Sequence, residues 1–450
     1  MKSLSMLSNL TQNKLNTTSK KVTLLSTRVV SVVLLSLFTF ASQSYAENLA
    51  ITGAKIHTMS SKGVIEEGTV LIQDGIIKQV LEGVSVPAGY TEIDATGKVV
   101  TPGLIGALTN LGLVEVSMSA GVNDAYVDAH KISSVGAAYD VQYAINTDST
   151  LIGITRLEGF TSAVTGIAST GQLFDGQGAF ISLSTSFNSV LKTGAFMHVD
   201  LSSGGADKIG ESRAALWVAL NQSLDEAEYV AGNPLTPSWE WHGMISRADA
   251  KPLVKVINGE MPLLVTANRA NDILQVLALK KRYSNIKIVL VSASDGWRVA
   301  EQIAAAKVPV ILNPEYNLPG QFDQLGATMK NAARLHVANV ELTIGIETHN
   351  ARLAPQHAGN AVANGLPHSA ALAALTINPA RLYGVDSLVG SLEVGKQADI
   401  VIWSGDPLEV TQAAEQVFIK GESMVMESRQ TKLRDRYLHR DPNKPAAYSK

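Results

Sequence analysis

The side chains that could hold a catalytic metal are scattered along this chain. Histidine occurs nine times in 450 residues, without a His-x-His pair, a His-Glu-x-x-His motif or a local cluster. The positions are His57, His130, His198, His242, His336, His349, His357, His368 and His439. Zinc takes three or four imidazole, thiolate or carboxylate ligands, so no single stretch of the sequence marks a zinc site. We expect most of these histidines to be surface residues or hydrogen-bonded core residues.

Other catalytic arrangements are also missing from the sequence. There is no cysteine, which excludes disulfides, thiolate metal sites and cysteine nucleophiles. No Gly-x-Ser-x-Gly elbow is present to expose a serine nucleophile, and the glycine-rich stretches match neither a P-loop nor a dinucleotide fingerprint. Arg156, Arg269 and Arg352 could clamp a carboxylate or phosphate, with Arg352 the preferred candidate. A structural ion pair is the alternative for each arginine.

Both ends of the chain have the sequence pattern of short strands, and the region between them has a different pattern. In "TVLIQDGIIKQV", Asp74-Gly75 predicts a two-residue hairpin turn, and "GKQADIVIW" and "AEQVFIKGE" have the same strand-and-turn texture. Between them, apolar runs such as "MPLLVTAN", "IKIVLVSAS" and "VPVILNP" alternate with the helical stretches "NDILQVLALKKRYSN" and "RVAEQIAAAK". Continuous apolar strands alternating with helices predict a parallel α/β sheet or barrel.

The N-terminal segment has the pattern of an export signal. Five basic residues and no acidic residue precede the apolar run 29–40, and "SQSYA" offers a cleavage site near Ala46. At 12 residues, this run is shorter than the roughly 20 needed to span a membrane. We therefore predict a cleaved signal peptide, no membrane span after cleavage and a periplasmic location. The net charge of -3 and the lack of a basic stripe argue against a nucleic-acid partner.

Five motifs in this chain resemble those of the amidohydrolase superfamily, close to exported amidohydrolases related to imidazolonepropionase. They are "DATGKVVTPGLIGALTNLG", "PLLVTANRANDILQVL", "KIVLVSASDGWRVAEQI", "GNAVANGLPHSAALAALTINPARLYGV" and "GSLEVGKQADIVIWSGDPLE". The resemblance implies an α/β fold with a (β/α)₈ TIM-like barrel and a small β-sandwich domain built from both chain ends. The expected parts are a signal peptide (1–46), sandwich strands (47–103 and 391–440), the barrel (104–390) and a polar tail (441–450).

Members of this family hydrolyse bonds with one or two divalent metals at the C-terminal ends of the barrel strands. The family pattern has His-x-His on the first strand, one His each on the fifth and sixth, and Asp on the eighth. By resemblance, these positions hold Leu108 with Asn110, then Thr266, Ser292 and Glu347. Asn268 follows Thr266 where some relatives carry a second His, and His349 and Arg352 follow the last strand.

Leucine cannot coordinate a metal, and amides and hydroxyls are poor zinc ligands. No zinc is therefore expected at the inherited site; ligation of Mg²⁺ or Ca²⁺ by Glu347, Asn110 and Asn268 is the alternative.

Two functions follow from the resemblance. The first is a hydrolase of carbon–nitrogen bonds other than peptide bonds, with Glu347 as the acid/base residue. The second is a catalytically inactive pseudoenzyme, either a periplasmic binding protein or the partner subunit of an active amidohydrolase. For the second we expect a small polar molecule in a barrel-mouth pocket formed by Asn110, Thr266, Asn268, Ser292, His349 and Arg352. The sequence leaves open both homo- and hetero-oligomers and whether the chain is an enzyme.

Overall fold

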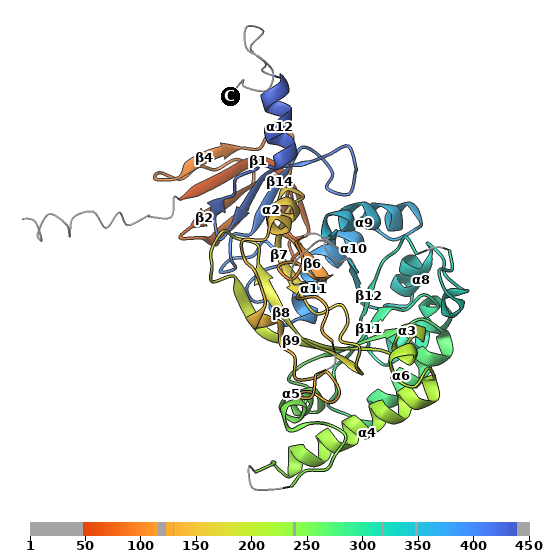
Figure 1. The fold of residues 1–450 in the computed structure, drawn as a ribbon. Coiled ribbons are helices and arrows are strands. Elements are labelled where there is room, and N and C mark those ends of the chain that lie inside the picture. The colour runs from red at the N-terminus through yellow and green to blue at the C-terminus, as the bar shows by residue number, and fades with distance from the viewer. Residues whose placement is uncertain are drawn as a thin grey trace, which may run out of the picture. The chain divides into compact units, whose positions relative to one another are not determined.

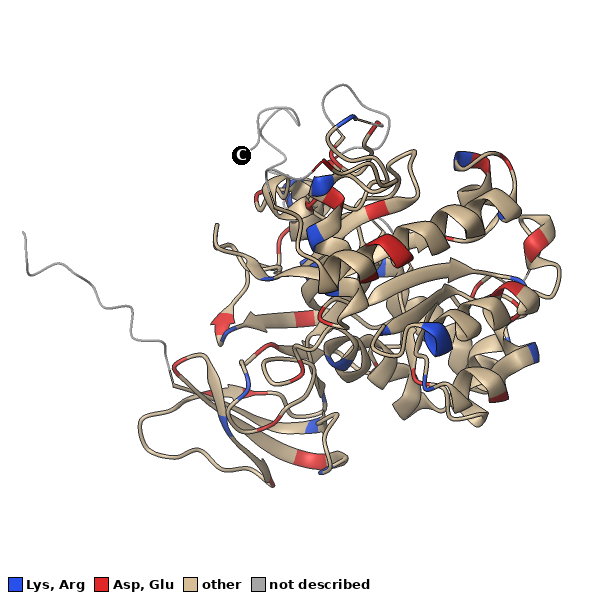
Figure 2. Cartoon of the chain, turned by 90° about the horizontal axis from the view of Figure 1, so that it is seen from below, with Lys and Arg blue, Asp and Glu red and all other residues tan. Residues whose placement is uncertain are grey.

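The computed structural model describes residues 48–115, 123–128, 130–236, 240–316, 318–346 and 350–438. The predicted signal peptide and polar tail lie outside these residues, as do Glu347 and His349. In the described part of the chain, no helix is both long enough and apolar enough to cross a membrane. Basic and acidic residues are interspersed on the ribbon in Figure 2.

One eight-stranded sheet combines strands from both ends of the described chain. Its order is β16-β15-β14-β5-β1-β2-β3, with β4 pairing β1, so strands of 49–102 lie beside strands of 400–423 (Figure 1). The strands are β1 (Leu49–His57), β2 (Val64–Gln73), β3 (Ile76–Glu82), β4 (Thr91–Asp94), β5 (Val99–Pro102), β14 (Ile400–Trp403), β15 (Ala414–Ile419) and β16 (Glu422–Ser423). The predicted hairpin is confirmed: Gln73 pairs with Ile76, and Asp74 and Gly75 have φ of 53° and 72°. Positive φ at both turn residues is what a type I′ turn requires.

A second eight-stranded sheet forms the barrel, in the order β13-β12-β11-β10-β9-β8-β7-β6. It closes where the Leu108 amide donates to the Gly345 carbonyl, 3.2 Å away. The strands are β6 (Leu104–Thr109), β7 (Phe160–Thr165), β8 (Phe174–Ser182), β9 (Val190–Asp200), β10 (Leu263–Ala267), β11 (Ile288–Ser292), β12 (Val310–Leu312) and β13 (Leu342–Ile344). The predicted fold class, an α/β barrel with a second β domain, is confirmed.

The barrel departs from a uniform (β/α)₈ arrangement in one region. Strand β8 pairs antiparallel with both β7 and β9, and no helix separates these three strands. The beginning of β8 therefore lies beside the end of β9. This reversal matters for the site, because it brings residues from the start of one strand next to residues at the end of another.

Helices follow most of the other strands. Between β6 and β7 lie η1 (Val141–Tyr143) and α2 (Thr150–Leu157), and between β9 and β10 lie α3 (Ser203–Lys208), α4 (Arg213–Gly232) and α5 (Arg247–Ile257). The later crossovers contain α6 (Ala270–Arg282), η2 (Gly296–Val299), α7 (Ala300–Ala305), η3 (Phe322–Gln324) and α8 (Asn331–Val337). After β13 come η4 (Ala351–Leu353), α9 (Ala354–Ala363), α10 (His368–Leu375) and α11 (Ile377–Leu382), and the last described helix is α12 (Arg429–Leu438).

Alternate residues of the barrel strands divide between two apolar clusters. On β10, Leu263 and Val265 pack in the large cluster with the helices, whereas Leu264 belongs to a smaller cluster inside the barrel. This period of two is the geometry of a strand, in which successive side chains point to opposite faces. Thr266 is therefore on the inward-facing side of β10, at its C-terminal end.

Candidate functional site

A pocket of about 260 Å³ opens at the C-terminal ends of β6, β7 and β9, the end at which barrels of this kind place their sites. Most of its lining is apolar, and two of its polar side chains are Asn110 and His198. The full lining is Leu108, Thr109, Asn110, Gly166, Ile167, Ala168, Phe196, His198, Tyr316 and Ile346. Of the predicted pocket residues, Asn110 is thus in the pocket, and Leu108 beside it supplies apolar surface.

Asn110 uses its amide to join two neighbouring strand ends. It is buried, and its Nδ2 donates to the carbonyl of Gly166, just beyond β7. Thr109 next to it donates its hydroxyl to the Val164 carbonyl at 3.0 Å. An amide nitrogen is not a metal ligand, so Oδ1 is the one atom of this side chain that could bind a cation. Asn110 therefore fastens the end of β6 to the end of β7.

His198 is the centre of a polar chain that crosses three strands. Its Nε2 lies 2.9 Å from the Thr266 hydroxyl at the end of β10, and its Nδ1 lies 2.9 Å from Asp175 Oδ2 at the start of β8. The other oxygen of Asp175 accepts a hydrogen bond from Lys208 Nζ at 3.0 Å. The His198 side chain is 15% exposed, in contrast to 1% for Asp175. The imidazole thus has one edge toward the pocket and a buried carboxylate behind it.

The surroundings of Asp175 keep this carboxyl group ionised. Burial alone would raise the pKa of Asp175, but hydrogen bonds from His198 and Lys208 and the nearby positive charge of Lys208 outweigh burial and hold the pKa below its ordinary value. Because an ionised carboxylate only accepts hydrogen bonds, we assign the His198 proton to Nδ1. Nε2 is then an acceptor, and the Thr266 hydroxyl must donate to it.

The structure groups two other predicted residues separately. Asn268 is buried, and its Oδ1 accepts hydrogen bonds from the hydroxyls of Ser292 at 2.7 Å and Ser294 at 3.0 Å. Ser292 and the following Ala293 have φ of 72° and 47°, so the chain turns sharply where β11 ends. These side chains tie the end of β10 to the end of β11.

The structure does not bring Arg352 to the barrel-mouth pocket. Arg352 lines a different hollow, together with Glu158, Trp403 and Leu408. Burial raises the pKa of Glu158, and the charge of Arg352 opposes that rise. Arg352 thus lies beside the Glu158 carboxyl group rather than in the barrel-mouth pocket.

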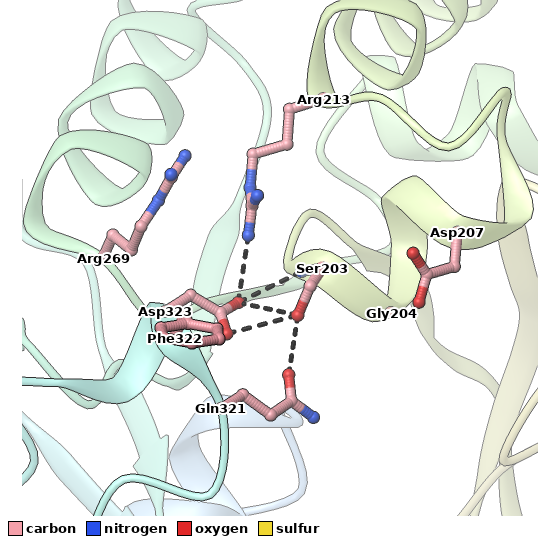
Figure 3. Close-up of a pocket in the computed structure, with 8 residues that line it drawn as sticks. All are labelled: Ser203, Gly204, Asp207, Arg213, Arg269, Gln321, Phe322 and Asp323. Atoms are coloured by element: carbon pink, nitrogen blue, oxygen red, sulfur yellow. Dashed lines mark hydrogen bonds and ion pairs between the residues drawn. The ribbon is translucent and has the colours of Figure 1, made fainter.

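A larger hollow of about 390 Å³ lies between the loops after β9, β10 and β12 (Figure 3). Its lining is Ser203, Gly204, Asp207, Arg213, Arg269, Gln321, Phe322 and Asp323. Both arginines already have carboxylate partners: Arg213 donates to Asp323 at 3.1 Å, and Arg269 makes two bonds, of 2.6 and 2.7 Å, to Asp272. Ser203 also bonds Asp323 and Gln321. With its charges neutralised internally, this hollow has no strong preference for an anion.

The described donors at the barrel mouth do not fit the zinc site of the family. Leu108 has no donor atom, and Asn110 offers only an amide oxygen. The hydroxyls of Thr266 and Ser292 are hydrogen-bonded to His198 and Asn268. Within the described ranges, no three His, Cys, Asp or Glu side chains gather closely enough to hold a metal ion. The imidazole and carboxylate donors that zinc prefers are thus not assembled by the described residues.

Sequence reasoning missed the two residues that give this pocket its polar chemistry. His198 was predicted to be an ordinary surface or hydrogen-bonded histidine, and Asp175 was not among the predicted site residues. A signal for His198 does exist: in "AFMHVD" it alternates with Met197 and Val199, so it shares the inward face with Phe196. No local signal could have paired Asp175 with it, because the pairing depends on the antiparallel placement of β8.

Comparison with known proteins agrees with this architecture. Residues 276–426 match the model described as "Amidohydrolase family". Over 57 residues the chain is 47% identical to the amidohydrolase tasK of Hapsidospora irregularis, and over 58 residues it is 41% identical to a dihydroorotase of Geobacter metallireducens. Each match spans 13% of this chain, but only 6% and 13% of the respective relatives.

Among solved structures, an amidohydrolase from Thermotoga maritima MSB8 has a similar fold, with a TM-score of 0.74. The alignment covers 84% of this chain and 99% of that one, at 22% sequence identity. Residues 276–426 thus match the amidohydrolase family model, and the likeness to the Thermotoga maritima structure shows a shared fold.

Proposed function

We propose that this protein binds a small, mainly apolar organic molecule in the barrel-mouth pocket, without the histidine-ligated metal of its family. The observation that carries the proposal is the lining itself, in which Leu108, Phe196 and Ile346 supply apolar surface beside His198. Pockets that hold small molecules combine apolar walls with a few placed polar groups. This ligand is less polar than the one expected from sequence, because Asn268 and Ser292 hydrogen-bond each other and the Asn110 amide nitrogen donates to the Gly166 carbonyl.

The chemical class of the ligand is suggested by the relatives. The curated relatives are an amidohydrolase and a dihydroorotase, names that point to amide-type bonds. We therefore propose a compound with one carbonyl group, an amide or an ester, whose apolar part occupies the pocket. Hydrolysis of a carbon–nitrogen bond is the finer form of this proposal. The alternative is an inactive partner of a second amidohydrolase, which copurification of such a homologue would support.

Acetanilide is a suitable probe, because it joins a phenyl ring to a single amide and is small enough for a cavity of this size. We expect saturation-transfer NMR to show binding of acetanilide to the mature protein. Ala168→Trp should abolish the signal by filling the pocket. Ala214→Trp, on the exposed surface of α4, should leave it unchanged. Equal signals for both variants would contradict the pocket as the binding site.

We also propose that the chain is exported and acts in the periplasm, like the imidazolonepropionase-related amidohydrolases that its motifs resemble. Support comes from the basic segment and the apolar run 29–40 that precede Ala46. Cell fractionation and N-terminal sequencing test this. A periplasmic protein that begins near Glu47 is the expected result, and full-length protein in the cytoplasm would contradict it.

A further inference from the structure

Thr266, His198 and Asp175 have the arrangement of a nucleophile, its base and the group that orients the base. The two distances of 2.9 Å lie within the range in which a catalytic base contacts its nucleophile and its orienting carboxylate. Such triads are recognised by geometry and roles rather than by sequence position or fold. We propose that Thr266 is a nucleophile activated by His198, and that the protein cleaves small carboxylic esters by a metal-independent route.

The hydrogen-bond directions agree with these roles. Lys208 and Asp175 form an ion pair at 3.0 Å, so the carboxylate accepts the Nδ1 proton of His198. This leaves Nε2 as a base toward the hydroxyl of Thr266. Asp175 does not reach the pocket itself and is a positioning residue, which holds the ring in one tautomer and orientation.

Access to the base comes from the pocket, and the hydroxyl of Thr266 lies within hydrogen-bond distance of that base. His198 lines the pocket with an edge of its ring, and Thr266 is partly exposed at the inward-facing end of β10. Three apolar side chains of the lining, Leu108, Phe196 and Ile346, would surround the acyl or alcohol part of an ester. This inference rests on the proposed function, because the same pocket must hold the substrate.

The proposed reaction balances without a metal or an oxidant. Thr266 Oγ1 bonds the ester carbonyl carbon while its proton passes to His198 Nε2. The carbon–oxygen bond to the alcohol then breaks, and the alcohol leaves with that proton. Water, deprotonated by His198, attacks the acyl-threonine ester, which releases the carboxylic acid and restores the hydroxyl of Thr266.

Diisopropyl fluorophosphate tests the nucleophile directly. Attack by Thr266 Oγ1 forms a phosphorus–oxygen bond and expels fluoride, while the proton passes to His198. We expect peptide mass spectrometry of the mature protein to find the diisopropylphosphoryl group on Thr266. Thr266→Val should remove the label, and Thr266→Ser should keep it.

Thr343→Val is the matched control, because the buried Thr343 hydroxyl on β13 has no hydrogen-bond partner among the described residues. That variant should label like the parent.

Two further variants separate reactivity from binding. His198→Asn should slow labelling at least about tenfold, because it removes the general base. Asp175→Asn should slow it as well, since an amide donating to Nδ1 reverses the imidazole tautomer. Acetanilide binding should persist in Asp175→Asn, whose side chain does not line the pocket, and a general loss of structure would not allow this. In a parallel assay, the parent should hydrolyse 4-nitrophenyl acetate with saturation, and Thr266→Val should lose this activity.

The possible failures are distinguishable. Absence of acetanilide binding in the parent overturns the proposed function. Binding of acetanilide with no label on Thr266, or with equal labelling of the parent and His198→Asn, overturns the triad alone. In that case the hydrogen bonds around His198 serve only to hold strands β8, β9 and β10 together.

Discussion

Trp403 on β14 donates its indole N–H to the hydroxyl of Thr101 on β5 across 2.9 Å. The bond is buried and joins residues 302 positions apart in the sequence. The far edge of the same indole lies against Gly159, where an added Cβ would come within 2.3 Å of the ring. Gly159 has φ of +84° and immediately precedes β7. One tryptophan thus connects the shared terminal sheet with the entry to a barrel strand.

Gly159→Ala is expected to destabilise the protein by several kcal/mol, because it combines a steric overlap with a left-handed backbone conformation. Trp403→Phe should lower the free energy of unfolding by about 2 to 4 kcal/mol, because it removes a hydrogen bond and leaves a cavity.

Gly153→Ala in helix α2 is the control, since the nearest atom to an added Cβ at Gly153 is a flexible Arg156 nitrogen at 3.7 Å. It should be neutral or slightly stabilising in urea unfolding. Equal effects at the two glycines would contradict this account.

Asp249 lies in the first turn of helix α5 and hydrogen-bonds residues 133–138, in the segment between β6 and η1. Its carboxylate is fully buried and accepts hydrogen bonds from Ser133, Ser134, Ala138 and Ser246. Burial works to raise the pKa of Asp249, but these hydrogen bonds outweigh it and hold the pKa below its ordinary value. Its stabilising contribution is therefore present above the pKa of an unfolded aspartate and is lost as pH falls through the lowered folded value. Asp249→Asn should cost about 2 to 4 kcal/mol at pH 7, with a smaller cost in acid, by urea unfolding.

Asp399, before β14, should respond to pH with the opposite sign. Burial raises the pKa of Asp399 to about 6, despite opposing hydrogen bonds from the Lys420 amide and Thr161. The folded protein therefore favours the protonated form, and stability is lost as pH rises from about 4 to about 6. Asp399→Asn should be more stable than the parent at pH 8, by up to about 3 kcal/mol, with the gain vanishing near pH 4. Thermal unfolding of both proteins across this range would measure the difference, and a gain independent of pH would refute the assignment.

Zinc should neither copurify at stoichiometric levels nor stabilise the protein. Asn110, Thr266, Asn268 and Ser292 offer only amide and hydroxyl oxygens, which are poor zinc ligands. The side chains of Thr266, Asn268 and Ser292 also hydrogen-bond protein partners. We expect elemental analysis of the purified mature protein to find well below one zinc per chain. Dialysis against EDTA should leave the melting temperature unchanged. A stoichiometric metal, with a melting temperature that falls in EDTA, would overturn our reading of the mouth.

Several parts of the fold could be predicted from sequence because their causes are local. The apolar runs "PLLVTA" and "KIVLVS" contain β10 and β11, and the intervening helical pattern contains α6. At Asp74-Gly75 the turn type follows from the tolerance of these two residues for positive φ. The resemblance of five motifs to a known family then predicted the closed barrel and the second β domain. No local pattern specifies that the sheet closes or that the two chain ends share one domain.

Only the tertiary structure decided what the polar side chains do. His198 meets Asp175 and Thr266 from 23 and 68 positions away in the sequence, because β8 reverses direction between β7 and β9. Asn110 was expected in an open polar pocket, yet its amide bonds a carbonyl 56 residues away. Periodicity shows which face of a strand a side chain occupies, but its hydrogen-bond partner depends on strand order, direction and register. The sequence by itself thus determined the strands and helices of this barrel, whereas the chemistry at its mouth was decided by which strand ends the closed sheet brings together.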